Sequence, residues 1–145
     1  MVNLKIDQKL LSNIDLVVFD KDGTLFDLHK YWSFVIIERA KYFSNICPRP
    51  ESGFIYSELL AAMGLGENNM INSAGPVGVK SRNFIINLVY KIINDKNTSI
   101  SIKDVEDGFI VVDSIVDNNF KSIVEKLPGI DDLMLSLKES GWLIS

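Results

Sequence analysis

An apolar, β-branched run near the N-terminus ends abruptly in a cluster of acidic and turn-forming residues. Residues 14–19 read Ile-Asp-Leu-Val-Val-Phe and are followed by Asp20, Lys21, Asp22 and Gly23. A run of this length and composition suits a buried strand of a parallel sheet better than a helix, which needs more residues. The sequence therefore predicts an α/β fold in which this strand leads into the acidic turn at the carboxyl edge of the sheet, where open α/β sheets bind their ligands.

From residue 28 onward the apolar residues take the spacing of helices. There are four such stretches. Pro48 and Pro50 separate the first from the second, and Gly64, Gly66 and an Asn- and Gly-rich loop over residues 67–79 separate the second from the third. We therefore expect residues 28–126 to form an all-helical block. The positions that mark the four helices are Trp32, Val35, Ile36, Ala40 and Phe43; Ile55, Leu59, Ala62 and Met63; Phe84, Ile85, Leu88, Val89 and Ile92; and Val105, Phe109, Val112, Val116 and Phe120.

The C-terminal part changes its pattern again. A Leu-Pro-Gly turn at residues 127–129 precedes an amphipathic helix over residues 130–137, Gly141 is placed to end that helix, and Trp142 opens another apolar run. With the helical block removed, the order is strand, helix and beginning of strand, which is a βαβ unit. The predicted fold class is thus α/β, with an incomplete Rossmann-like core of residues 1–27 and 127–145 that is interrupted by the helical block 28–126.

Composition narrows the classes of partner. Hydrophobic residues make up 47% of the 145 residues, which is ample for a buried core. The net charge of −4 and the lack of a basic stripe argue against nucleic acid as a partner, and the apolar runs are too short to span a membrane. Lys5, Asp7 and Lys9 interrupt any signal-peptide core, and the single Cys47 cannot form an internal disulfide. We therefore expect a cytoplasmic protein.

Residues 17–27, Val-Val-Phe-Asp-Lys-Asp-Gly-Thr-Leu-Phe-Asp, resemble the first motif of the haloacid dehalogenase superfamily, an apolar strand followed by Asp-x-Asp-Gly-Thr-Leu. The match is complete over the motif. The turn, helix, glycine and strand after residue 127 are more weakly similar to the phosphoglycolate-phosphatase-like members, which carry an inserted helical cap of the C1 type. The resemblance implies magnesium-dependent hydrolysis of a small phosphorylated metabolite, a phosphomonoester, through an aspartyl-phosphate.

The chemistry gives reasons for the spacing within this motif. The Asp20 carboxylate can attack phosphorus, and Asp22 can protonate the leaving oxygen and later take a proton from water. Gly23 permits a tight turn, the backbone of Lys21 to Thr24 can cradle phosphate oxygens, and the Thr24 hydroxyl can brace the turn. By resemblance, the Asp20 carboxylate and the Asp22 backbone carbonyl hold Mg²⁺, whose positive charge offsets the repulsion between two carboxylates and a phosphate.

Other interpretations remain open. The acidic segment can also be a hairpin turn or a plain solvated loop, whereas a calcium loop is disfavoured because its glycine position holds Leu25. The alternative functions are an aspartyl-phosphate phosphomutase and a catalytically silent binding or regulatory fragment. The superfamily also uses a later Ser or Thr, a Lys and an acidic metal ligand beyond the strand that begins at Trp142, so we expect residues 1–145 alone to be inactive or nearly so.

Three further residues are lesser candidates. Lys80 and Arg82 lie at the start of the third predicted helix, where an anion is favoured, and can contact a remote group of the substrate. The alternative for both is a solvated helix face. His29 lies just past the motif and can face the site, although a lone histidine at a polar helix start favours the interpretation as a solvated residue.

Overall fold

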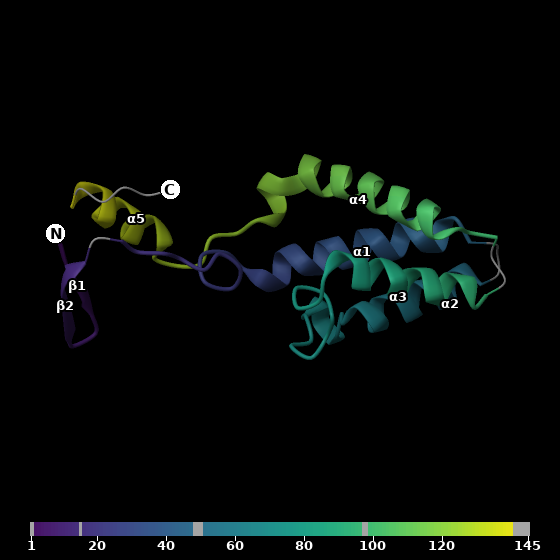
Figure 1. Ribbon diagram of the computed structural model, residues 1–145, viewed down its shortest axis with the longest axis horizontal. Helices are drawn as coiled ribbons and strands as arrows, with labels where there is room; N and C mark the ends of the chain where they lie inside the picture. Colours follow the sequence, from purple (N-terminus) through teal and green to yellow (C-terminus); the bar gives the residue numbers. More distant parts are fainter. Residues whose placement is uncertain (1, 15, 48–50, 97–98, 141–145) are drawn as a thin grey trace. The chain divides into compact units, whose positions relative to one another are not determined.

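The chain folds into two compact units. The computed structural model describes residues 2–14, 16–47, 51–96 and 99–140. One unit combines Met1–Asp27 with Lys126–Ser145, and the other is Leu28–Glu125 (Figure 1). Within the described ranges, no helix is long and apolar enough to cross a membrane.

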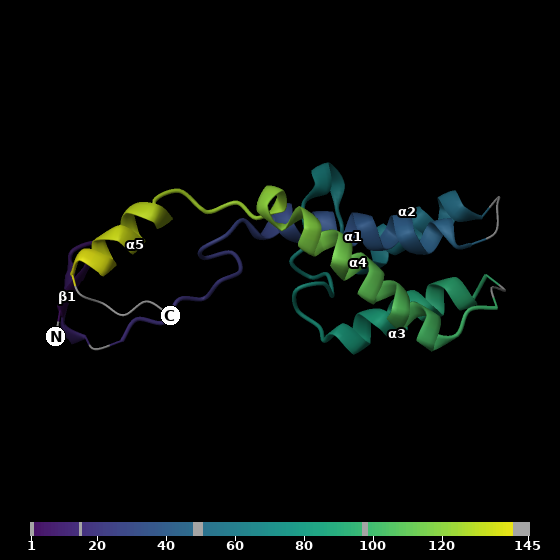
Figure 2. The ribbon, with the colours of Figure 1, turned by 90° about the horizontal axis from the view of Figure 1, so that it is seen from above.

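Four helices build the second unit: α1 (Leu28–Asn45), α2 (Ser52–Met63), α3 (Arg82–Asn94) and α4 (Ile102–Ile123). Each packs against two others, because α1 and α3 both contact α2 and α4 (Figures 1 and 2). The four helices predicted from the apolar spacing are therefore confirmed. The loop predicted between the second and third helices is also confirmed, and it contains one short 3₁₀ turn, Glu67–Asn69.

The core of this helical unit lies where the apolar stripes of the helices meet. Gly108 of α4 is placed where α1 approaches closely, since a Cβ atom at this position would lie 2.6 Å from a ring carbon of Tyr42 and 2.8 Å from the ring of Phe43. A glycine inside a predicted helix thus has a packing reason. The largest fully buried side chains are Phe43, Phe109, Ile36, Ile55, Leu59, Met63, Ile93, Val89, Val105 and Val112.

Local signals explain where these helices begin and end. Ser101 and Asp104 form a capping box at the start of α4, with the Ser101 backbone N–H donating to Asp104 at 2.8 Å. Ser81 caps α3 by accepting a hydrogen bond from the Phe84 backbone N–H at 3.3 Å. Gly64 ends α2 with φ at 92°, a left-handed conformation that glycine adopts without a Cβ penalty.

The first unit begins with a β-hairpin that the sequence analysis did not anticipate. Strands β1 (Val2–Ile6) and β2 (Lys9–Ile14) pair antiparallel, and Asp7 takes a left-handed conformation in the turn, with φ at 52°. A bulge shifts the register between the Val2–Ile14 and Leu4–Leu11 pairs. Asn13 sits in that bulge with φ at 61°, a conformation that asparagine tolerates better than most residues.

The predicted α/β fold class, with its Rossmann-like core, is wrong for the described residues. They contain five α-helices and one two-stranded sheet, whose strands pair only with each other. Residues 16–21 belong to no helix or strand, and the side chains of Leu16 and Val18 are 71% and 81% exposed. A buried parallel strand needs hydrogen-bonded neighbours and helices on both faces. Without such neighbours, β-branched composition alone does not make a strand.

The C-terminal helix, α5 (Ile130–Glu139), confirms the helix expected after the Leu-Pro-Gly turn. Gly129 precedes it with φ at 83°, and the Ile130 backbone N–H donates to the Leu127 carbonyl at 3.3 Å. The helix terminator expected at Gly141 and the strand expected from Trp142 lie outside the described residues.

Candidate functional site

The acidic motif forms a compact loop immediately before α1. The Leu25 and Phe26 backbone N–H groups both donate to the Lys21 carbonyl, at 3.0 and 3.3 Å, and the Gly23 N–H donates to the Phe26 carbonyl at 3.1 Å. Gly23 has φ at 79°, which a residue with a Cβ rarely adopts. The tight turn expected at Gly23 is therefore present, although it is reached from an irregular segment and not from a strand.

A second segment holds this loop in place. The Leu127 backbone N–H donates to the Leu25 carbonyl at 3.0 Å, and Phe26 and Lys126 form an isolated antiparallel bridge. Two parts of the chain that are about a hundred residues apart in sequence thus meet behind the acidic turn. Backbone hydrogen bonds of this kind anchor the turn, and residues 20–24 are exposed.

The loop presents both aspartates to solvent. The Thr24 hydroxyl donates to Oδ2 of Asp20 at 3.4 Å, so Thr24 braces the turn as its place in the motif suggested. The ammonium of Lys21 lies 2.8 Å from Oδ1 of Asp22, and the two side chains are 69% and 45% exposed. An exposed carboxylate that is oriented through one oxygen retains its other oxygen, Oδ1 of Asp20, for attack on an electrophile.

The loop offers the type of oxygen ligand that Mg²⁺ prefers, but too few ligands to fill its coordination shell. Carboxylate and carbonyl oxygens are the ligands that Mg²⁺ prefers, and it is usually held by one or two carboxylates together with waters and substrate phosphate. Asp20 and Asp22 supply such oxygens. However, the described part of the chain contains no group of three or more His, Cys, Asp or Glu side chains placed to bind one metal ion. Within the described ranges, no third such side chain joins Asp20 and Asp22 at one metal position.

Lys80 and Arg82 belong to the helical unit, whereas the acidic loop belongs to the other unit. Arg82 begins α3 and forms an ion pair with Asp113 of α4, with 2.6 Å between Nη2 and Oδ2. The ammonium of Lys80 lies 5.9 Å from the centroid of the Phe84 ring. Both residues are exposed, as the solvated alternative expects, and both also line a cavity of about 150 Å³.

His29 is not the solvated residue that the sequence suggested. Its Nδ1 accepts a hydrogen bond from the Ile71 backbone N–H at 3.1 Å, and the side chain is only partly exposed. The ring therefore fastens the loop between α2 and α3 to the first turn of α1. This is a structural role within the helical unit.

The sequence analysis missed Arg39, which lies in the middle of α1. Its side chain is only 7% exposed, and it lines two cavities of the helical unit, of about 310 and 150 Å³. Burial lowers the pKa of Arg39 to about 10, an effect that Asp113 partly counters and Arg82 reinforces. A signal was available, because Arg39 follows Ile36 by three residues and precedes Phe43 by four, which places a charged residue on the apolar stripe of the helix.

No family model, curated protein or solved structure matches this chain.

Proposed function

We propose that this protein transfers the phosphoryl group of a small phosphate monoester to Asp20 and then to water. The observation that carries the proposal is the complete Asp-x-Asp-Gly-Thr motif folded as one braced loop, with the Thr24 hydroxyl 3.4 Å from the Asp20 carboxylate. The proposal is supported by this loop alone. The parallel sheet expected around it gives no support, since residues 16–21 form no strand.

The proposed reaction has two steps. In the first, Oδ1 of Asp20 attacks phosphorus, the bond from phosphorus to the ester oxygen breaks, and the Asp22 carboxyl gives its proton to that oxygen. In the second, water attacks the phosphorus of the aspartyl-phosphate, Asp22 takes a proton from the water, and the Asp20 carboxylate leaves. Inorganic phosphate and an alcohol are the products, and both carboxyl groups return to their starting states.

Each remaining residue of the loop has a task in this scheme. Thr24 orients the Asp20 carboxylate, and the left-handed turn at Gly23 allows a phosphate to approach the backbone N–H groups. The contact between Lys21 and Asp22 must open before Asp22 can reach a leaving oxygen. When bound by Asp20 and Asp22, Mg²⁺ would neutralise charge on the phosphate oxygens.

Single-turnover phosphorylation tests the proposal more sharply than steady-state turnover. The protein is mixed with Mg²⁺ and an excess of p-nitrophenyl phosphate, quenched in acid, digested and analysed by mass spectrometry. We expect a hydroxylamine-sensitive phosphoryl group on Asp20, and its loss in Asp20→Asn because an amide is a poor nucleophile. Asp132→Asn, at an exposed position in α5 of the same unit, is the matched control and should label like the wild type.

Two results would sink the proposal. One is p-nitrophenol release that is equal in the wild type and Asp20→Asn; the other is a phosphoryl group on a residue other than Asp20. Slow release of phosphate after efficient labelling fits the expectation that residues 1–145 lack a full set of metal and phosphate ligands. Labelling without any Mg²⁺ requirement would remove the metal from the scheme.

A further inference from the structure

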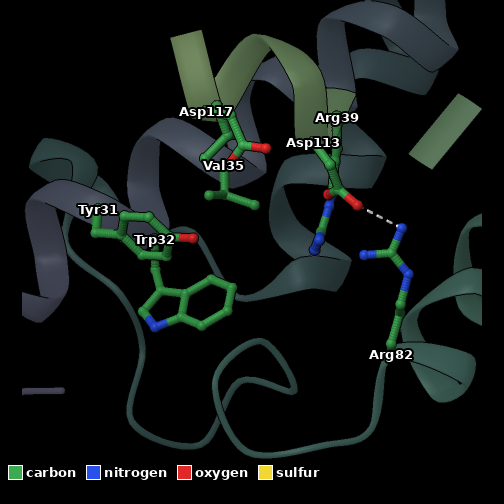
Figure 3. A pocket seen from close by; sticks show the side chains of 8 residues that line it. Tyr31, Trp32, Val35, Arg39, Arg82, Asp113 and Asp117 are labelled. Carbon is green, nitrogen blue, oxygen red and sulfur yellow. Dashed lines mark ion pairs between the residues drawn. The ribbon is translucent and has the colours of Figure 1, made fainter. Parts of the chain in front are cut away.

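The helical unit contains a cavity of about 310 Å³ between α1, α4 and the start of α3. Tyr31, Trp32 and Val35 line one side of it, and Arg39, Arg82 and Asp113 line the other (Figure 3). Val116 and a second carboxylate, that of Asp117, complete the lining. A smaller cavity of about 150 Å³ shares Trp32, Arg39 and Arg82 with the first and adds Lys80. The two cavities thus meet at the same pair of arginines.

Arg39 is a buried cation without a direct partner. Among the hydrogen bonds and ion pairs of the described residues, none involves its guanidinium, and its Nε is fully buried with no hydrogen-bond partner. One face of the guanidinium is covered, since its central carbon lies 4.5 Å from the centroid of the Phe109 ring. A buried charge is normally paired, because leaving water without a partner costs several kcal/mol.

The second arginine reinforces the positive charge. The central carbon of Arg82 lies 5.4 Å from the centroid of the same Phe109 ring, and both arginines line the cavity together with Asp113 (Figure 3). Asp113 contacts Arg82 at 2.6 Å. Of the two guanidinium groups, only that of Arg82 is in direct contact with a carboxylate.

Trp32, which lines both cavities, carries a second buried hydrogen-bond donor. The Nε1 of Trp32 is buried without a partner, in addition to the Nε of Arg39. Each of these groups donates and cannot accept. The side opposite the arginines is mainly aromatic, and there Tyr31 packs edge-on against Trp32 with 5.1 Å between the ring centroids. The Trp32 Nε1 lies beside Gly78, on the side of the indole ring away from the two guanidinium groups, so the donors that face the larger cavity are those of Arg39 and Arg82. Charged donors beside an aromatic surface are a usual composition of a small-molecule pocket.

From this arrangement we propose that the cavity binds a small organic anion whose carboxylate or phosphate group is received by Arg39 and Arg82 while its compact apolar body lies against Tyr31, Trp32 and Val35. Planar guanidinium groups recognise oxyanions of both kinds through paired hydrogen bonds. All the residues involved belong to the helical unit. The proposal is therefore independent of Asp20 and of the phosphoryl transfer proposed above.

Benzoate, benzamide and inorganic phosphate are suitable probes of the full chain. Benzamide has nearly the shape of benzoate but no charge, and inorganic phosphate supplies an oxyanion without an apolar body. We expect benzoate to shift the Trp32 indole N–H signal in nuclear magnetic resonance spectra with a dissociation constant of about 1 mM or below, and benzamide to bind at least about tenfold more weakly. Comparing benzoate, phosphate and phenyl phosphate shows which oxyanion the site prefers.

Variants locate the binding site. Arg39→Met and Arg82→Gln should each weaken benzoate binding by about tenfold or more, whereas Lys103→Met should not change it. Lys103 is a matched control, because it is an exposed cation of α4 that pairs with Asp107 at 3.3 Å. Arg82 is 45% exposed, so its replacement should fold even if that of Arg39 does not.

Three of the four outcomes that would overturn the proposal concern the ligands and the Arg82 variant. They are equal binding of benzoate and benzamide, an unchanged affinity for benzoate in Arg82→Gln, and no saturable shift of the Trp32 signal by any of the anions. The last of these would mean that Arg39 is buried for structural reasons and is hydrated in the cavity. Loss of binding in Lys103→Met to the same extent as in the arginine variants would show only a general effect of net charge, and it would equally contradict the assigned site.

Discussion

Replacing Arg39 by methionine should make the protein more stable. Burial lowers the pKa of Arg39 to about 10 from its ordinary value of 12.5. At about 1.4 kcal/mol for each tenfold change in a protonation equilibrium, this corresponds to about 3 kcal/mol by which the charged side chain disfavours the folded state. Because the side chain is only 7% exposed, solvent screens this cost little.

Part of that gain will be offset in the variant. The guanidinium lies over the Phe109 ring at 4.5 Å, and such contacts contribute about 0.5–2 kcal/mol. Methionine has a similar length and helix propensity and also packs well against aromatic rings, so it recovers some of this contact. We therefore expect a net stabilisation of about 1–2 kcal/mol, since an unpaired buried charge is often less favourable than an apolar residue of similar volume.

Urea unfolding followed by circular dichroism measures the effect, in a buffer without phosphate or carboxylate anions. Lys41→Met is the control, because Lys41 is an exposed residue of α1 that pairs with Glu38 at 2.7 Å, and its loss should change the free energy of unfolding by no more than about 0.5 kcal/mol. A destabilisation of Arg39→Met by about 1 kcal/mol or more would refute the reasoning. It would mean that the guanidinium contributes favourably to the fold without any ligand.

Further predictions concern the core, the exposed segment, the thiol and the acid–base residue. Gly108→Ala should destabilise the protein by up to about 2 kcal/mol in urea unfolding. Overpacking against the buried Phe43 ring costs about 1–3 kcal/mol, and the gain in helix propensity returns only about 1 kcal/mol. An increase in stability would show that the rings move aside freely. Hydrogen exchange should be slow for the amides around Phe109 and fast for Leu16 to Phe19, because the side chains of Leu16 and Val18 are 71% and 81% exposed. The reverse order would mean that residues 16–19 are paired in a sheet. Burial, aided by Glu51, raises the pKa of the Cys47 thiol, so at pH 8–9 Cys47 should react with Ellman's reagent more slowly than a free cysteine until urea unfolds the chain. In protein active enough for steady-state assay, Asp22→Asn should slow hydrolysis of an alkyl phosphate by about 10²–10⁴-fold and that of p-nitrophenyl phosphate much less, and an equal loss on both esters would contradict the acid–base role.

The helices could be predicted from the sequence because each carries its own signals. In α4, for example, apolar residues at helical spacing lie behind Ser101 and Asp104, which form the capping box. Gly64 and Gly129 likewise mark helix boundaries through positive φ angles that local sequence suggests. Such signals depend on residues within one or two turns of each other, so tertiary context does not override them here.

Strands could not be predicted in the same way, because strand formation depends on partners that can lie far away in the sequence. The run Leu16 to Phe19 has strand composition, yet the described chain supplies no neighbour for it, and the pairing takes place instead between Val2–Ile6 and Lys9–Ile14. That hairpin escaped notice because its turn, at Asp7 and Gln8, contains no glycine. The acidic turn itself was anticipated, since Gly23 and Thr24 act locally.

Arg39 shows how far the cavity of the helical unit could be predicted from the sequence. Its position on the apolar stripe of α1 could be recognised from the sequence. Its neighbours Arg82 and Asp113 could not, because they belong to α3 and α4 and approach Arg39 only when the helices pack. Residues that converge from three helices leave no spacing pattern in the sequence. Unusual polar residues on an otherwise apolar stripe are the signal that remains.

The two ends of the helical unit come together in space. Lys30, near the start of α1, contacts Glu125 just after α4 at 2.7 Å, while Phe26 and Lys126 form a bridge outside the unit. A segment with adjacent ends can interrupt a host loop at little entropic cost, which makes it a portable module in evolution and in engineering. Residues 28–125 grafted into a two-residue turn of an unrelated stable protein should therefore keep their helical content while the host retains its own fold.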